Sequence, residues 1–252
     1  MKLVLSPAKS LDFDTELPVE KQSEAVFLDE AAQINKLLKK QSVKKLGELM
    51  SISPDLSELN YQRNQDWQLP FKATNSRPAV YAFNGDVYRG LDAYSIDNDK
   101  IDTLQNKVRI LSGLYGILKP LDLIMPYRLE MGTKFPIGKS KDLYQFWKSK
   151  VTTFLNNEMT EGEVLLNLAS NEYFKAVDKK QLKANVVDVD FKEFKNGTYK
   201  TISFFAKYAR GLMARYVVEH QIENVEDLKA FDLDNYNFDA NLSTTNKLVF
   251  TR

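Results

Sequence analysis

Cysteine is absent from the 252 residues of this chain, and histidine occurs only once, as His220. Without cysteine the chain can form neither disulfides nor thiolate metal sites. A single histidine also excludes the paired histidine ligands of common zinc sites. Because His220 lies far along the chain from the carboxylate motifs, the sequence contains no recognisable Ser-His-Asp triad. We therefore expect no bound metal and no cofactor, although a site built only from carboxylates needs neither residue type.

Long apolar runs are missing too. No stretch approaches the roughly 18 apolar residues that would span a bilayer. The apolar part of the start, MKLVLSPAKSLDF, is too short for a signal peptide and is interrupted by Pro7 and Lys9. Together with the absence of cysteine, this pattern predicts a cytoplasmic protein without a membrane partner.

Glycine-rich phosphate loops are the third absence. The chain has 10 glycines, and none falls in a Walker or a Rossmann G-x-G-x-x-G pattern. P-loop nucleotide hydrolysis and dinucleotide binding of the Rossmann type are therefore excluded as explanations.

Net charge is only +1, but the charges are unevenly distributed. Residues 103–150 hold nine Lys and Arg against three Asp and Glu, and residues 192–215 hold six against one. Such segregation can build one basic face on a nearly neutral protein, suited to a nucleic acid or another anion. The alternative is a set of unrelated, solvated lysines.

Hydrophobic periodicity predicts an α/β protein. We expect strands at 2–5, 78–85, 163–169, 185–191, 198–205 and 247–250, and helices at 20–40, 42–50, 54–61, 101–111, 139–158 and 207–220. Asn196-Gly197 is a strong β-hairpin signal, which argues against a purely parallel sheet. With no linker or repeat, residues 1–252 are predicted to form a single domain (α/β, mixed α+β), in which helices surround a mixed sheet.

The segment RILSGLYGILKPLDLIMPYRLEMG, residues 109–132, has the spacing of a helix-hairpin-helix-like element. Gly113 and Gly116 would let the backbone approach a phosphate, with Arg109, Lys119 and Arg128 as nearby cations. The alternative is an ordinary turn between two helices, and Pro120 restricts any second helix to a start near that residue.

Four charged residues are candidates for catalysis. Lys9 follows the first strand, Asp86 ends the next predicted strand in FNGDVYRGL, and Glu172 follows a buried strand in NLASNEYFKAV. Glu130 lies two residues after Arg128 in an apolar run, which indicates a paired, partly buried site. The alternatives are an exposed lysine for Lys9, an Asx turn for Asp86, and a helix N-cap at Ser170 or Asn171 beside Glu172.

The helical segment KYARGLMARYVVEH places Lys207, Arg210 and Arg215 on one side, together with Gly211. A basic side that includes a glycine would admit a phosphate backbone closely. A simple solvated face is the alternative.

Taken together, SPAKSLDF, FNGDVYRGL, LSGLYGILKPLDLIMPYRLEMG, KDLYQFW, NLASNEYFKAV and KYARGLMARYV resemble the bacterial YaaA family, also called DUF328 or UPF0246, over essentially the whole chain and in the same order. The resemblance implies a cytosolic protein of the peroxide-stress response that limits damage from unincorporated iron. It also implies a DNA-binding α/β fold with a basic cleft and a helix-hairpin-helix. The hairpin would fall on residues 111–117, and the cleft on Lys9, Arg128, Lys207, Arg210 and Arg215.

Two main hypotheses follow, from different classes of protein. The first is a DNA-binding stress protein, selective for DNA structure, that grips phosphates with its basic segments. The second is an enzyme that acts on a nucleotide or another anionic small molecule, with Lys9 and the arginines holding the anion and Asp86, Glu130 or Glu172 as general acid or base. A third is a scaffold that docks an acidic partner. A wide basic groove favours DNA, whereas a narrow pocket lined by both carboxylates and cations favours the enzyme.

Overall fold

The fold is built around a mixed β-sheet in a computed structural model that describes residues 1–72 and 74–252. Its strands are β1 (Lys2–Leu5), β5 (Val108–Ser112), β6 (Gly116–Leu118), β8 (Val164–Asn167), β9 (Asn185–Lys195), β10 (Thr198–Lys200), β11 (Asn237–Phe238) and β12 (Lys247–Thr251). They follow the order β11-β12-β9-β8-β1-β5-β6, and β10 pairs with β9. The five strands from β12 to β5 run parallel, while β6, β10 and β11 add antiparallel pairs. The predicted α/β class with a mixed sheet is confirmed.

The helices are α1 (Leu28–Leu38), α2 (Val43–Met50), α3 (Pro54–Asp66), α4 (Ala79–Ala82), α5 (Asp86–Leu91), α6 (Ile101–Lys107), α7 (Leu143–Glu158), α8 (Asn171–Phe174), α9 (Ser203–Glu219) and α10 (Val225–Leu228). Several begin at side-chain caps. The side chains of Ser42, Ser53 and Asp142 accept hydrogen bonds from the third backbone N–H after each of them. These caps satisfy donors that the first turn of a helix leaves unpaired.

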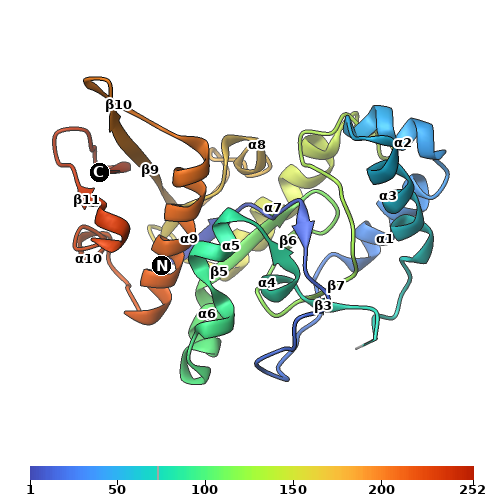
Figure 1. Cartoon of the computed structure of the whole chain (residues 1–252), viewed down its shortest axis with the longest axis horizontal. Coiled ribbons are helices and arrows are strands. Elements are labelled where there is room, and N and C mark those ends of the chain that lie inside the picture. Colours follow the sequence, from blue (N-terminus) through green and yellow to red (C-terminus); the bar gives the residue numbers. More distant parts are fainter. Residues whose placement is uncertain (73) are drawn as a thin grey trace.

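The remaining strands form two separate two-stranded ribbons. In one, β2 (Ser10–Leu11) pairs with β4 (Phe83–Asn84), and in the other, β3 (Arg77–Pro78) pairs with β7 (Leu123–Ile124). Short 3-10 turns lie at Ala93–Ser95, Asn98–Lys100 and Leu233–Asn235. In Figure 1, α1 to α3 gather at one end of the molecule, and β9 to β12 with α10 lie at the other. Helix α9 lies against α5 beside the sheet, and the sheet's central strands are buried between these ends.

The central strands are apolar because they are covered on both faces. Leu3, Val4 and Leu5 are each fully buried, and β1 pairs with β8 on one side and β5 on the other. A continuous apolar run is typical of such a doubly covered parallel strand. The carboxyl ends of β1 and β8 therefore emerge side by side at one edge of the sheet, where ligand sites form in open α/β sheets.

Some predicted elements are wrong. Residues 78–85 form the helical turn α4 followed by β4 rather than one strand, and all four residues of α4 are buried. A short apolar run cannot by itself distinguish a strand from a buried helical turn. The predicted helix 101–111 ends at Lys107, because the apolar residues that follow enter the sheet as β5. The helix predicted over 20–40 begins only at Leu28, and the strand predicted over 198–205 ends at Lys200.

The helix-hairpin-helix prediction is also corrected. β5 and β6 form an antiparallel β-hairpin, with Ser112 opposite Gly116. The Ser112 hydroxyl accepts the N–H of Tyr115 inside the turn, and Gly116 has a φ of +70°, which suits glycine. Buried Ile, Leu and Val side chains in both arms pack better in a sheet between layers than on two exposed helices.

Candidate functional site

A cavity of about 380 Å³ opens where β1 and β8 end. We call it the strand-end pocket. It is lined by residues 6–10 after β1, by residues 84–88 at the start of α5, by Glu130, by Leu168, Ser170, Glu172 and Tyr173 after β8, and by Lys207 and Arg210 on α9. All four catalytic candidates, Lys9, Asp86, Glu130 and Glu172, therefore lie around one cavity.

Hydrogen bonds join the segments that follow β1 and β8 in the lining of the pocket. The N–H of Ser170 donates to the Ser6 hydroxyl at 2.9 Å, and the two hydroxyl oxygens are 3.3 Å apart. The Tyr88 hydroxyl donates to the carbonyl of Ser6 at 3.1 Å. Burial raises the pKa of Tyr88 well above its ordinary value, so this phenol stays a neutral donor. The cross-links hold the ends of β1 and β8 in fixed positions around the cavity.

Two of the three carboxylates in the pocket are already neutralised. Glu130 Oε1 lies 3.1 Å from Lys9 Nζ and 3.2 Å from Arg128 Nη2. Asp86 pairs with Arg89, one turn along α5. The predicted partnership of Arg128 with Glu130 is thus present, and Arg128 reaches the pocket through that carboxylate.

Glu172 differs from the other two carboxylates. Its Oε1 accepts the backbone N–H of Gly132 at 3.0 Å, and within residues 1–72 and 74–252 it forms no ion pair. Gly132 makes this contact possible, because a Cβ at that position would lie 2.9 Å from the same oxygen. The carboxylate is held in place while its charge is left without a cation.

Among the described residues, Lys207 and Arg210 are cations of the pocket that lack a carboxylate partner, just as Glu172 lacks a cation. They lie one turn apart on α9, both line the pocket, and across the described chain neither forms an ion pair. The Nε atom of Arg210 is buried without a hydrogen-bond partner among the described residues. Burial lowers the pKa of Arg210, while Asp190 acts in the opposite direction. Arginine nevertheless stays charged, so this guanidinium favours an anion in the cavity.

A close helix crossing brings these cations to the pocket. Gly90 of α5 lies against the backbone of Tyr208, and Gly211 of α9 lies against the backbone of Val87. Any side chain at either glycine would collide with the partner helix. The interpretation of Gly211 as an approach point for phosphate is therefore wrong, since its free space is filled by α5.

The other predicted nucleic-acid residues lie elsewhere or are engaged. Arg109 is 1% exposed and pairs with Glu158 at 2.5 Å, and Lys119 pairs with the same carboxylate at 2.9 Å. Burial raises the pKa of Glu158, but the two cations outweigh it and the net shift is downward. Arg215 binds Glu219 at 2.7 Å and the carbonyl of Asp92 at 2.9 Å.

Gly113 and Gly116 are buried as well. A Cβ on Gly113 would meet the backbone of Leu129, and one on Gly116 would meet the ring of Trp147 at 2.6 Å. The indole N–H of Trp147 donates to the carbonyl of Gly113 at 2.9 Å. These glycines pack the β5–β6 hairpin and leave no room for a phosphate.

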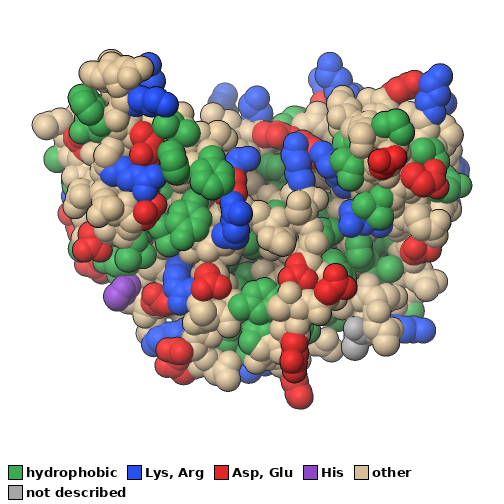
Figure 2. All heavy atoms as spheres, viewed as in Figure 1, with side chains coloured by type: hydrophobic (Ala, Val, Ile, Leu, Met, Phe, Trp, Pro, Cys, Tyr) green, Lys and Arg blue, Asp and Glu red, His purple; other side chains and the backbone are tan. Residues whose placement is uncertain are grey.

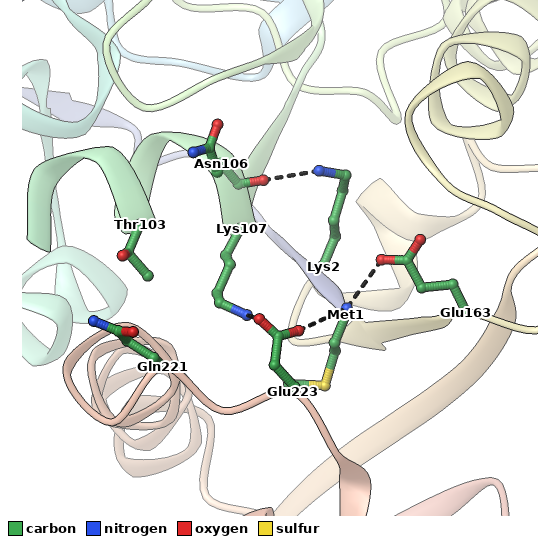
Figure 3. A pocket seen from close by; sticks show the side chains of 8 residues that line it. All are labelled: Met1, Lys2, Thr103, Asn106, Lys107, Glu163, Gln221 and Glu223. Atoms are coloured by element: carbon green, nitrogen blue, oxygen red, sulfur yellow. Dashed lines mark hydrogen bonds and ion pairs between the residues drawn. The ribbon is translucent and has the colours of Figure 1, made fainter.

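A second cavity, of about 340 Å³, provides a contrast at the opposite edge of the sheet, where β1 begins (Figure 3). Most of its charges are paired with one another. The amino group of Met1 pairs with Glu163 at 2.9 Å and Glu223 at 3.3 Å, Lys107 pairs with Glu223 at 2.5 Å, and Lys2 donates to the carbonyl of Asn106 at 2.9 Å. This network ties the strand ends to α6 and the segment after α9, and it leaves neither carboxylate of the cavity without a cation.

The sequence alone did not single out Ser6, Tyr88 and Tyr173, which all line the strand-end pocket. Ser6 is the first residue after β1, so its position at a strand end was the available signal. The two tyrosines gave no such signal, because aromatic residues beside turns are more often part of the core. Burial raises the pKa of Tyr173, with further contributions from Tyr127 and the carboxylates Glu172 and Glu130.

A parallel sheet core with a charged pocket at the carboxyl ends of its strands defines an α/β protein whose main cavity lies at the position where open α/β sheets bind ligands. The chain belongs to the peroxide stress protein YaaA family, whose model matches residues 1–242. It is 58% identical to a UPF0246 protein of Flavobacterium johnsoniae and 54% identical to one of Flavobacterium psychrophilum, in each case over 252 residues and 100% of both chains. A UPF0246 protein of Saccharophagus degradans is 51% identical over 100% of this chain and 99% of its own.

Among the helices of residues 1–72 and 74–252, none is long and apolar enough to cross a membrane. No group of three or more His, Cys, Asp and Glu side chains there is arranged to hold a metal ion.

Proposed function

We propose that this member of the peroxide stress family works by binding an anionic small molecule in the strand-end pocket, as an enzyme acting on such a ligand. The observation that carries the proposal is the pair Lys207 and Arg210. Both cations line a cavity, and neither has a carboxylate partner in the part of the chain that the structure describes. An unpaired, partly buried guanidinium is costly in the free protein and is stabilised when an anion binds.

The shape of the cavity supports a small ligand. A volume of about 380 Å³ is within the range of small-molecule sites and is small for a polymer. Carboxylates and cations share its walls, which is the arrangement expected of an enzyme that moves protons on an anionic substrate. Lys9, Asp86, Glu130 and Glu172 supply the groups for that chemistry.

The test is anion binding by matched variants. Lys207→Met and Arg210→Met each remove one cation and keep a long side chain, while Lys36→Met removes an exposed charge on α1, far along the chain from the pocket. Titration with inorganic phosphate and pyrophosphate should show about 10-fold or greater loss for the two pocket variants, because a hydrogen bond to a charged group contributes roughly 1.5–3 kcal/mol. Unchanged binding in both pocket variants would refute the proposal.

Binding of DNA is a second candidate function. Figure 2 shows Lys and Arg side chains gathered around the hollow between the two raised ends of the molecule. Exposed aromatic side chains belong to the same region of the chain as Lys192, Lys195, Lys200 and Lys207, namely Phe194, Tyr199, Phe204 and Phe205. Aromatic faces interleaved with cations suit the bases and phosphates of a nucleic acid. The corrected β-hairpin removes the helix-hairpin-helix from the support for this function.

In this proposal, the protein limits iron-dependent damage through the binding of its ligand or of DNA. The chain has no cysteine and one histidine, so it lacks the usual soft ligands for storing iron. Survival of a deletion strain under peroxide, complemented with Arg210→Met or with Lys36→Met, connects the pocket to this outcome. Protection should fail with Arg210→Met and persist with Lys36→Met.

A further inference from the structure

The strand-end pocket contains uncompensated charges of both signs on different walls. On the α9 wall, Lys207 and Arg210 have no carboxylate partner, and on the α8 wall, Glu172 has no cation, within the described ranges 1–72 and 74–252. No ammonium or guanidinium nitrogen of those residues lies within 4.0 Å of the Glu172 carboxylate. These opposite charges share a cavity and do not neutralise each other directly.

The other carboxylates of the pocket do not have this property. Glu130 is shared by Lys9 and Arg128, and Asp86 is paired with Arg89. A ligand group that approached either one would have to compete with a cation already in place. Glu172 is therefore the carboxylate of this pocket that is left for a positive or hydrogen-donating group of a ligand.

The backbone prepares Glu172 for that contact. The N–H of Gly132 fixes Oε1 at 3.0 Å, and Oε2 forms no hydrogen bond to another described residue. The hydroxyl of Tyr144 donates to the main-chain carbonyl of Glu172 at 2.9 Å, which anchors the start of α8. A carboxylate held by one oxygen, with the other free in a cavity, is a preorganised acceptor.

From this geometry we propose that the ligand of the strand-end pocket is an amino-bearing anion: its anionic group binds Lys207 and Arg210, and its amino group donates to Glu172. The inference rests on the proposed anion-binding function and adds the second recognition element. Two chemical sources fit the acceptor, an alkyl ammonium and a neutral exocyclic amine on a heterocycle.

The experiment compares pairs of probes that differ at the amino group. O-Phosphoethanolamine and ethyl phosphate differ by an ammonium, whereas AMP and IMP differ at the exocyclic amine. Affinity is measured by calorimetry on the full chain and on Glu172→Gln, Glu172→Ala and Arg210→Met. Glu161→Gln, which removes an exposed carboxylate on a turn, is the matched charge control.

In the unmodified protein, the amino-bearing member of at least one pair should bind about 10-fold or more tightly than its partner, as expected for a hydrogen bond to a carboxylate. If the donor is an ammonium, Glu172→Gln removes the preference. If it is a neutral amine, glutamine can still accept it, and only Glu172→Ala removes the preference. In both cases the partner without the amino group keeps its affinity or binds more tightly, because a negative charge beside the anion site is removed, and Glu161→Gln changes nothing.

Gly132→Ala provides a second route to the same site without changing Glu172. The added Cβ would push the Glu172 carboxylate away from its position. The fold should lose little stability, because the atoms that move are at the end of the flexible Glu172 side chain. The amino preference should fall as in Glu172→Ala.

The outcomes separate this inference from the proposed function. Equal binding within both pairs, lost together in Arg210→Met, would overturn the amino recognition and leave the anion site standing. A preference that persists in Glu172→Ala would also overturn it. Failure of the unmodified protein to bind any of the four probes or pyrophosphate would overturn both proposals.

Discussion

At the scale of single residues, the function of each charge depends on whether it already has a partner. Glu130 and Glu172 are both half-buried carboxylates of one pocket, yet Glu130 is held by two cations and Glu172 by a backbone N–H. The first is paired with Lys9 and Arg128, and the second forms no ion pair with a described residue. Their sequence contexts do not reveal this difference.

Glu130→Gln should therefore preserve or tighten the binding of pyrophosphate by the strand-end pocket. The substitution removes one negative charge beside an anion site and frees Lys9 and Arg128 from a charged partner. Calorimetric titration against the unmodified protein measures the change, with Glu161→Gln as the control for net charge. A loss of 10-fold or more would mean that Glu130 itself holds the ligand.

The same variant tests the catalytic role of Glu130. Removal of a general acid or base lowers a rate by typically 10² to 10⁴ while ligand binding survives. Lost peroxide protection in a complemented deletion strain, with intact pyrophosphate binding and an intact fold, would assign catalysis to Glu130. Full protection would leave Asp86 and Glu172 as the remaining carboxylate candidates.

At the scale of elements, glycines decide how closely neighbouring segments pack. The crossing of α5 and α9 depends on Gly90 and Gly211, and the β5–β6 hairpin depends on Gly116 beneath Trp147. The first contact places Lys207 and Arg210 at the pocket, and the second fixes the hairpin against α7.

Gly116→Ala should destabilise the fold by more than its backbone strain alone. Gly116 has a φ of +70° and faces the Trp147 ring, whereas Gly162 has a φ of +79° with nothing within 4 Å of an added Cβ. Gly162→Ala therefore measures the strain by itself, on the order of 1 kcal/mol. Urea unfolding should show a loss for Gly116→Ala that is larger by about 1 to 3 kcal/mol, the cost of overpacking.

An equal loss of unfolding free energy in Gly116→Ala and Gly162→Ala would show that the Trp147 ring moves aside without destabilising the fold. Pyrophosphate affinity of folded Gly116→Ala should remain unchanged, because Gly116 does not line the pocket. A selective loss of DNA binding in this variant would restore a direct role for the hairpin in contacting nucleic acid.

At the scale of the whole molecule, much of the segregated positive charge is used internally. Lys107, Arg109, Lys119 and Lys150 all pair with glutamates, and Arg215 pairs with Glu219. In the segment from β9 to α9, by contrast, Lys192, Lys195, Lys200 and Lys207 form no ion pairs with other described residues. A DNA contact, if it uses this segment, engages a few phosphates.

Under the DNA-binding candidate function, affinity for a duplex should decrease as salt rises. With about four phosphates engaged, log K should fall against log salt with a slope of roughly −4. Titrations at several salt concentrations measure the slope, and Lys195→Met should make it shallower by about 1. Affinity that is indifferent to salt, or absent at low salt, would exclude this candidate.

Much of the architecture was determined by local sequence pattern. The apolar run of β1, the hairpin at Asn196-Gly197, the capped helices α2 and α3 and the long α7 all follow from propensity, capping and turn chemistry within a few residues. The candidate catalytic residues were also accessible from the sequence, since Lys9, Asp86 and Glu172 each follow a short structured segment. Such positions are good candidates because polar side chains and functional sites concentrate in the loops that follow strands and helices.

Tertiary structure decided the rest. The segment 109–118 has glycines and apolar residues that satisfy either a helical or a strand pattern, and pairing of Val108 to Ile110 with β1 selects the strand. Pairing partners decided which charges are free: Arg109 pairs with Glu158, 49 residues later, whereas Arg210 forms no ion pair with a described residue. Because an ion pair depends on distance in space and on burial, and neither is encoded in spacing along the chain, only the folded structure could separate the cations that are paired from those that are not.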